Sequence, residues 1–223
     1  MIAIMGDIDM IRALIMFVVL LISLTVHEAA HALFAKLGGD PTAYNGGQVT
    51  LNPLPHIRRE PFGMVLLPAL SILLTSGQYC FGFAHAPVDP VWAYRNPRKA
   101  ALMSAAGPLS NVLLAALAFA VLYAIGRPVG HSESVDAICR IASWFLLLNV
   151  LLAVFNFIPL PPLDGASIVA GLVPATRRVY DNLSRSPLVT IVVLVLLFNF
   201  LGYLFRPIYD AIADLLPYRP KFR

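Results

Sequence analysis

Charged side chains and cysteines are both scarce in this sequence. Asp, Glu, Lys and Arg make up 13% of the 223 residues, whereas 59% are hydrophobic. That balance excludes an ordinary soluble domain and is typical of a polytopic membrane protein. The two cysteines, Cys80 and Cys139, are too few for a disulfide framework or a cysteine-based metal site. No basic cluster stands beside exposed aromatic residues, so nucleic acid is not expected as a partner.

What the sequence has instead is long apolar runs. Membrane helices are predicted at about 10–37, 99–125, 135–157 and 188–205. The N-terminal stretch MIAIMGDIDM has two acids and no basic residue, which is not typical of a cleavable signal. We expect an all-α polytopic membrane protein, a bundle of about 4–6 transmembrane helices. Residues 1–223 are expected to form one domain, with a core at about 10–173 and a C-terminal helix and tail at 187–223.

The connection after the first helix is rich in Pro, Gly and Asn. Within it, Asn45-Gly46 is typical of two-residue hairpin turns and is followed by the arm GQVTL. The sequence therefore predicts a small β-hairpin close to the end of the first helix.

Three ionisable side chains, His27, Glu28 and His31, interrupt the first apolar run. Residues four apart share one face of a helix, so the two histidines can offer imidazole nitrogens to one metal ion. Glu28 then lies beside the ion, where it can take a proton from water, as in zinc hydrolases with an HExxH helix. The alternative is a set of hydrogen-bonded structural residues. Because an ionisable residue in a membrane helix costs ~2.5–3.5 kcal/mol, we favour the metal site.

A catalytic zinc takes three protein ligands, and Asp164 in NFIPLPPLDG is the clearest third candidate. Pro159, Pro161 and Pro162 cannot extend a helix, because each lacks an N–H group. Gly165 permits a sharp turn, so Asp164 can point into the bundle. The alternative is an ordinary proline-rich helix end with a capping Asp.

The positions of the two motifs constrain the topology. Both lie at the C-terminal ends of helices, so 10–37 and 135–157 must run in the same direction for the motifs to meet. An intervening run at 62–76 is short and carries Pro68 in its middle. We therefore expect this run to be re-entrant and not a full crossing.

Together the motifs His27-Glu28-Ala-Ala-His31, GPLSN ending at Asn111, and Asn156 followed by PLPPLDG resemble the site-2 protease family of intramembrane zinc metalloproteases. The resemblance covers about residues 20–173. LNPLPHI and FGFAHAPV resemble its compact bacterial branch, which lacks PDZ and CBS domains. The chain departs from the family pattern at Arg58-Arg59, where an acidic residue is expected, and at Ala166-Ser167, where Gly-Arg is usual.

The resemblance implies hydrolysis of a peptide bond within or beside a transmembrane segment of a substrate protein. His27, His31 and Asp164 would hold one Zn²⁺ per chain, and Glu28 would act as general base. The predicted hairpin near the active site would pair, through residues 48–51, with an unwound substrate.

Four further polar residues have open roles. Asn111 and Asn156 are expected to hydrogen-bond the substrate backbone or the oxyanion, or alternatively to pair helices. His56 and His85 lie in polar connections, where each either supports the site or is an ordinary loop residue. The sequence does not set the oligomeric state.

The expected location is the bacterial inner membrane, with the lipid bilayer as a partner and the zinc face toward the cytoplasm. Nine Lys and Arg flank that face and seven the other, a small bias. The main rival function is a membrane transporter or channel that uses the His/Glu/Asp cluster as a metal or proton path. Transporters usually show paired broken helices, and only one broken segment is evident here. A relative that binds membrane segments without cutting them is the second rival.

Overall fold

The computed structural model describes residues 9–126, 132–220 and 222. Three long helices form its centre: α1 (Met10–Gly38), α6 (Pro97–Ile125) and α7 (Glu133–Phe157). Around them lie α2 (Thr42–Asn45), α3 (Pro53–Arg59), the π-helical turn η1 (Phe62–Leu66), α4 (Leu67–Leu74), α5 (Pro90–Arg95), α8 (Asp164–Leu172), the 3₁₀ turn η2 (Pro174–Thr176), α9 (Arg177–Ser184) and α10 (Pro187–Ala213). The predicted all-helical class is confirmed for the described residues.

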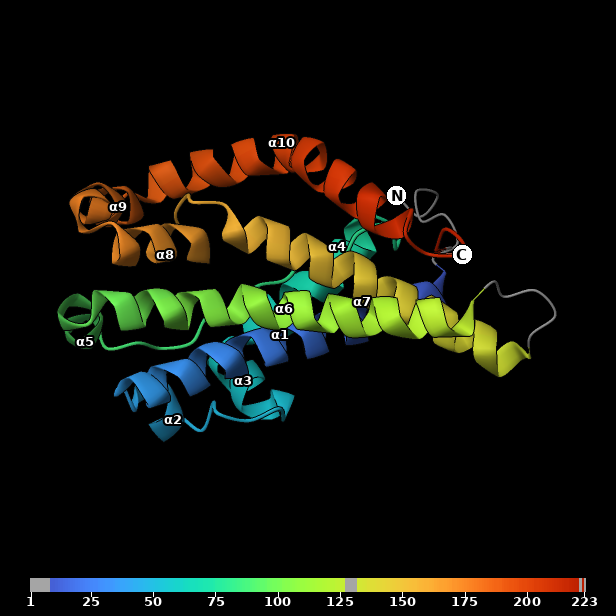
Figure 1. Ribbon diagram of the computed structural model, residues 1–223, viewed down its shortest axis with the longest axis horizontal. Coiled ribbons are helices and arrows are strands. Elements are labelled where there is room, and N and C mark those ends of the chain that lie inside the picture. The colour runs from blue at the N-terminus through green and yellow to red at the C-terminus, as the bar shows by residue number, and fades with distance from the viewer. Residues whose placement is uncertain (1–8, 127–131, 221, 223) are drawn as a thin grey trace.

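The core is formed where α1, α6 and α7 pack together. Figure 1 shows α1 and α7 running in the same direction and α6 running opposite to both, as the position of the two motifs required. Leu122 of α6 and Leu146 of α7 are fully buried against each other's helices, and Met16 of α1 packs near Leu148 of α7. Among the described helices, α1, α6 and α7 are long and apolar enough to cross a membrane. The range of four to six crossings stays a prediction.

The outer faces of these helices are apolar as well. Leu109, Leu113 and Leu117 of α6, spaced four residues apart, are each more than half exposed. A soluble protein rarely leaves such a continuous apolar stripe uncovered, whereas a lipid bilayer covers it.

Helix α1 begins and ends at recognisable signals. The Asp9 side chain accepts a hydrogen bond from Arg12 N at 3.0 Å, and Gly39 ends the helix with a left-handed φ of 101°. Two groups from elsewhere in the chain then bind the carbonyl oxygen of Gly38: the Trp92 indole N–H at 3.2 Å and the Lys99 ammonium at 3.1 Å. The end of α1 is thereby fixed to α5 and to the start of α6.

The predicted β-hairpin was wrong. Residues 42–59 form α2, α3 and intervening bends, and the described residues contain no strand. The reason is local: the Asp40 carboxylate accepts hydrogen bonds from Thr42 N and Oγ1 and starts α2, which Asn45 ends. The Asn-Gly pair therefore stops a short helix instead of turning a hairpin.

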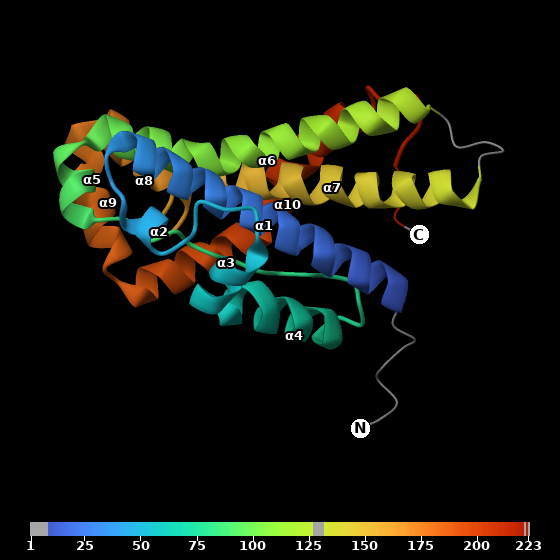
Figure 2. The ribbon, with the colours of Figure 1, turned by 90° about the horizontal axis from the view of Figure 1, so that it is seen from below.

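The segment between α3 and α5 folds back on itself. η1 and α4 run partway along the bundle, the chain turns at Ser76 and Gly77, which have φ of 51° and 76°, and an extended return leg leads to α5 (Figure 2). The return leg packs closely on the outgoing one. Phe83 N donates to Gly63 O at 3.1 Å, and a Cβ added at Gly63 would lie 2.1 Å from Phe83 O. The segment thus returns to the side from which it started (Figure 2), and its re-entry into a membrane stays a prediction.

Candidate metal centre

His27, His31 and Asp164 meet although 133 or more residues separate Asp164 from the histidines. His27 Nε2 and His31 Nε2 lie 2.9 Å apart, and Asp164 Oδ2 lies 3.1 Å from the first and 3.3 Å from the second. A tetrahedral zinc with bonds of about 2.0–2.1 Å places its ligand atoms about 3.3 Å apart. The three donor atoms therefore form one triangular face of the size that such an ion requires.

The outer nitrogens of both histidines contact oxygen acceptors. His27 Nδ1 lies 2.6 Å from Asn111 Oδ1, and His31 Nδ1 lies 2.8 Å from the carbonyl oxygen of Met103. Because a carbonyl oxygen only accepts, each Nδ1 carries a hydrogen, and in the neutral rings that a metal ion requires each Nε2 presents a lone pair to the other. Two lone pairs and a carboxylate in contact repel one another unless a cation lies between them. Two imidazoles and a carboxylate are a donor set that suits Zn²⁺.

A buried polar chain orients His27. Asn111 Nδ2 donates to Asn149 Oδ1 at 2.8 Å, and Asn149 Nδ2 donates to Ser23 Oγ at 2.9 Å. All three side chains are fully buried, and they link α6, α7 and α1. Sequence reasoning missed Asn149 and Ser23. Their signal was a single Asn in the apolar run WFLLLNVLLAVF and a Ser four residues before His27.

Glu28 is 2% exposed and lines the same cavity as the three donor groups. Its Oε2 atom has no hydrogen-bond partner in the described structure. A buried carboxylate oxygen without a partner is costly unless something polar, such as a water molecule on a metal ion, fills the space in front of it. Glu28 is thus positioned as a general base requires.

Gly107 of α6 forms the wall behind the two imidazoles. A Cβ added there would lie 2.3 Å from His31 Nε2 and 2.6 Å from His27 Nε2, so no larger residue fits without moving the donor atoms. Gly165 plays a similar part beside Asp164, because its Cβ would lie 2.3 Å from the carbonyl oxygen of Ile158. Both glycines let backbone segments approach closely enough to complete the site.

The cavity at this site has a volume of about 170 Å³. The polar residues that line it are His27, Glu28, His31, His85, Ser104, Asn156, Asp164 and Ser167. Asn111 does not line it; this residue is fully buried and supports His27, an arrangement closer to the helix-pairing alternative. Asn156 does line it. His56 is buried and its Nε2 contacts Thr50 O at 3.0 Å, away from the cavity.

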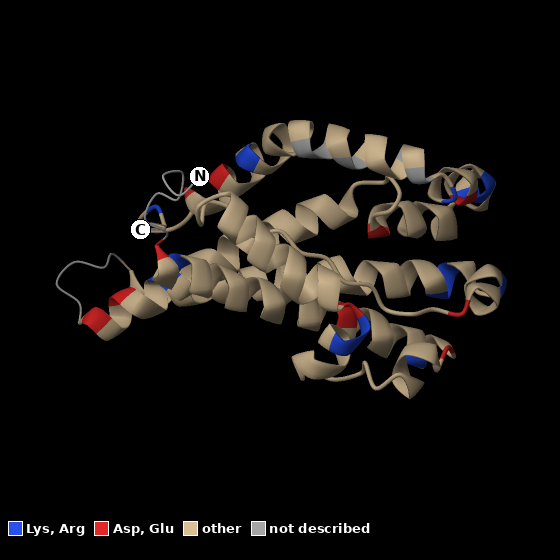
Figure 3. Ribbon diagram, turned by 180° about the vertical axis from the view of Figure 1, so that it is seen from behind, with Lys and Arg blue, Asp and Glu red and all other residues tan. Residues whose placement is uncertain are grey.

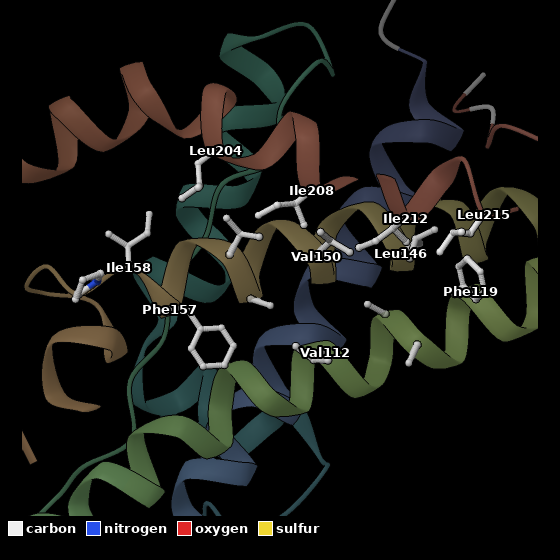
Figure 4. Close-up of a pocket in the computed structure, with 15 residues that line it drawn as sticks. Val112, Phe119, Leu146, Val150, Phe157, Ile158, Leu204, Ile208, Ile212 and Leu215 are labelled. Carbon is white, nitrogen blue, oxygen red and sulfur yellow. The ribbon is translucent and has the colours of Figure 1, made fainter. Parts of the chain in front are cut away.

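A larger cavity, of about 720 Å³, lies between α6, α7 and α10 (Figure 4). Its lining is entirely apolar, so it has no residue that could carry acid–base or metal chemistry. Leu204 and Ile208 of α10 line one side of it, and Phe157 and Ile158 lie at the end where the turn to Asp164 begins.

The chain is similar to known proteins over most of its length. The model of peptidase family M50 matches residues 15–200. The chain belongs to peptidase family M50. This confirms the expected membership of the site-2 protease family. No solved structure matches the chain.

Several relatives of the chain carry names that describe them as zinc metalloproteases. YwhC of Bacillus subtilis is 38% identical over 205 residues, which cover 88% of this chain and 86% of YwhC. Rip2 of Mycobacterium tuberculosis is 32% identical over 85% of this chain and 69% of its own length. Rip2 of Mycolicibacterium smegmatis is 30% identical over 79% of this chain and 64% of its own.

Proposed function

We propose that this M50 protein is an intramembrane zinc metalloprotease that hydrolyses peptide bonds within or beside transmembrane segments of other proteins. The observation that carries the proposal is the triangle of His27 Nε2, His31 Nε2 and Asp164 Oδ2, next to the partnerless oxygen of Glu28. When bound, zinc lowers the pKa of a coordinated water to about 7 and polarises the scissile carbonyl.

Each residue then has a defined part. Glu28 accepts a proton from the water, whose oxygen forms a bond to the carbonyl carbon of the substrate. Glu28 next delivers that proton to the amide nitrogen, the C–N bond breaks, and a carboxylic acid and an amine result. Asn156, on the cavity wall, is available to hydrogen-bond the substrate backbone.

The depth of the site supports cleavage inside the membrane. Seven residues of α1 follow His31, and at 1.5 Å per residue they put the metal site about 10 Å from the end of the helix. The neighbouring apolar cavity suits a hydrocarbon-rich substrate segment and not a soluble polypeptide.

The distribution of charge supports a cytoplasmic zinc face in a bacterial inner membrane. Figure 3 shows Lys and Arg at the end of the bundle where α5, α6 and α9 meet. The sequence assigns nine Lys and Arg to this side: Lys36, Arg58, Arg59, Arg95, Arg98, Lys99, Arg177, Arg178 and Arg185. Arg58 and Arg59 are on α3, which lies partway along the bundle (Figure 1). Four described arginines flank the other end, and positions 127, 221 and 223 lie outside the described residues. An excess of basic residues favours the cytoplasmic side.

The Glu28→Gln variant tests the proposal against the transporter alternative. We expect it to keep its zinc and to cleave quenched fluorescent transmembrane peptides in lipid nanodiscs about 10²–10⁴-fold more slowly, because the general base is lost. Zinc flux into vesicles should be absent in both forms. Equal cleavage by parent and variant, or zinc flux that depends on Glu28, would contradict the protease.

A further inference from the structure

His85 is an ionisable side chain in the metal-site cavity that the hydrolytic roles above do not use. It lies on the return leg of the fold-back and lines the same cavity as Glu28 and the three donor groups. Among the described residues that line this cavity, it alone can carry a positive charge without being a proposed zinc ligand. Its side chain is 65% exposed, so it faces open space and is not packed into the core.

A partly buried carboxylate fixes one edge of the His85 ring. His85 Nδ1 lies 3.0 Å from Glu60 Oε2, and the Glu60 side chain is only 18% exposed. Both ring nitrogens carry hydrogen when the imidazole is protonated, and Nε2 lies on the edge of the ring away from Glu60. Glu60 therefore orients the ring through Nδ1, and Nε2 is the ring nitrogen left to face another group.

The backbone around the pair is also held firmly. Glu60 ends α3 through a hydrogen bond from its N–H to His56 O at 2.9 Å, and its own carbonyl accepts from Met64 N at 3.1 Å. Two residues before His85, Phe83 donates to Gly63 O. Both partners are thus anchored on the same short stretch around η1, and a donor preorganised in this way is the kind that stabilises a developing charge.

Hydrolysis of a peptide bond develops negative charge on the carbonyl oxygen. Asn111 cannot meet that charge, because it is fully buried and engaged with His27 and Asn149. The amide nitrogen of Asn156 donates one of its two hydrogens to Leu152 O at 3.0 Å, and its remaining hydrogen is a neutral donor, weaker toward an oxyanion than a charged one.

We propose that His85, oriented by Glu60, donates a hydrogen bond from Nε2 to the carbonyl oxygen of the scissile peptide as it becomes an oxyanion. This assignment rests on the proposed function. His85 is then a catalytic residue and Glu60 a positioning residue. The active site is thus built from the polar connection before α5 as well as from the membrane helices.

The test measures binding of a tetrahedral analogue, and so needs no natural substrate. Zinc-loaded parent, His85→Ala, His85→Lys and Glu60→Gln proteins are titrated with a phosphinic peptide of the form Ala-Leu-Ψ(PO₂CH₂)-Ala-Leu, whose charged oxygens imitate the intermediate. We expect His85→Ala to bind about 100-fold more weakly, in the range found when one oxyanion donor is removed. His85→Lys, which keeps a charged donor, should recover at least 10-fold of that loss, and Glu60→Gln should lie between parent and His85→Ala.

Two controls separate this role from a merely structural one. Tyr79→Ala removes an exposed aromatic side chain of the same connecting segment that does not line the cavity, and should bind the analogue within twofold of the parent. Zinc content and thermal stability should be the same in all variants. Binding by His85→Ala within threefold of the parent would overturn the inference, as would loss of binding that Lys does not rescue. Failure of the parent itself to bind would instead count against the proposed function.

Discussion

At the scale of single residues, Gly107 is the position where the smallest change should have the largest effect. A methyl group there would overlap the Nε2 atoms of His27 and His31. Because packed interiors relax only partly, the histidines and not the helix backbone must move. We expect Gly107→Ala to lower zinc affinity by about 100-fold, as much as the largest losses from changes around a metal site.

The matched control is Gly202→Ala in α10, where an added Cβ meets nothing within 4 Å. Zinc affinity is measured by competition with a chromophoric chelator on both purified variants. Unchanged zinc affinity in Gly107→Ala would show that Gly107 does not lie against the two imidazoles as described.

Residue spacing allowed part of this site to be predicted. His27 and His31 share a helix face at any rotation of that helix, and the prolines before Asp164 exclude continued helix, so local chemistry was sufficient for both. Gly107, Asn149 and Ser23 depend on how three helices are rotated against one another. Spacing within one helix carries no such information. For that reason the sequence left open whether Asn111 binds substrate or pairs helices.

At the scale of elements, Asp40 joins the end of α1 to α2 and α5. It is 1% exposed; Oδ1 accepts from Thr42 N and Oγ1, and Oδ2 accepts from Asp89 N at 2.9 Å. Burial alone would raise the pKa of Asp40, but these donated hydrogen bonds outweigh it and lower the pKa below its usual value. The ionised form is therefore the one that stabilises the connection.

The sign of the pH dependence follows from that lowered pKa. The contribution of Asp40 to the free energy of unfolding is fully present above about pH 4, where its carboxyl is ionised in the unfolded chain as well. That contribution is lost as the pH falls through the lowered folded-state pKa. Asp40→Asn should destabilise the protein by about 1–3 kcal/mol at pH 7, since hydrogen bonds to a charged group are weakened. Thermal unfolding in detergent at pH 7 and pH 3 measures this.

The difference between parent and Asp40→Asn should shrink at the lower pH. Asp181→Asn, a change at an exposed carboxylate on α9, serves as the control and should change the melting temperature little at either pH. A difference for Asp40→Asn that grows on acidification would contradict the assignment.

The ends of helices with strong stop signals were predicted closely from sequence, whereas an element with an ambiguous turn signal was not. The ends of α1 and α7 fall within two residues of the predicted ones, because Gly39 and the prolines after Phe157 stop helices in any context. The hairpin failed because Asn-Gly also suits a helix end, and the competing hydrogen bonds of Asp40 decide between the two. Such bonds join residues across a turn and leave no periodic signal.

At the scale of the whole molecule, the parallel course of α1 and α7 makes a testable statement about topology. The loop after α1 and helix α9 lie at one end of the bundle, and the start of α7 lies at the other (Figure 2). In a Cys80→Ala, Cys139→Ala background, cysteines at Asn45 and Asn182 should react with a membrane-impermeant maleimide from the same side of sealed vesicles. A cysteine at Ser134 should react only from the opposite side. Labelling of Asn45 and Asn182 from different sides would exclude the arrangement.

The account as a whole depends on a metal ion held between α1 and the start of α8. Elemental analysis of the purified, folded protein after equilibration with zinc tests this most directly. We predict one zinc per chain in the parent and in Glu28→Gln, and almost none in His31→Ala or Asp164→Ala. A folded parent without zinc, or an Asp164→Ala variant that keeps a full equivalent, would contradict it.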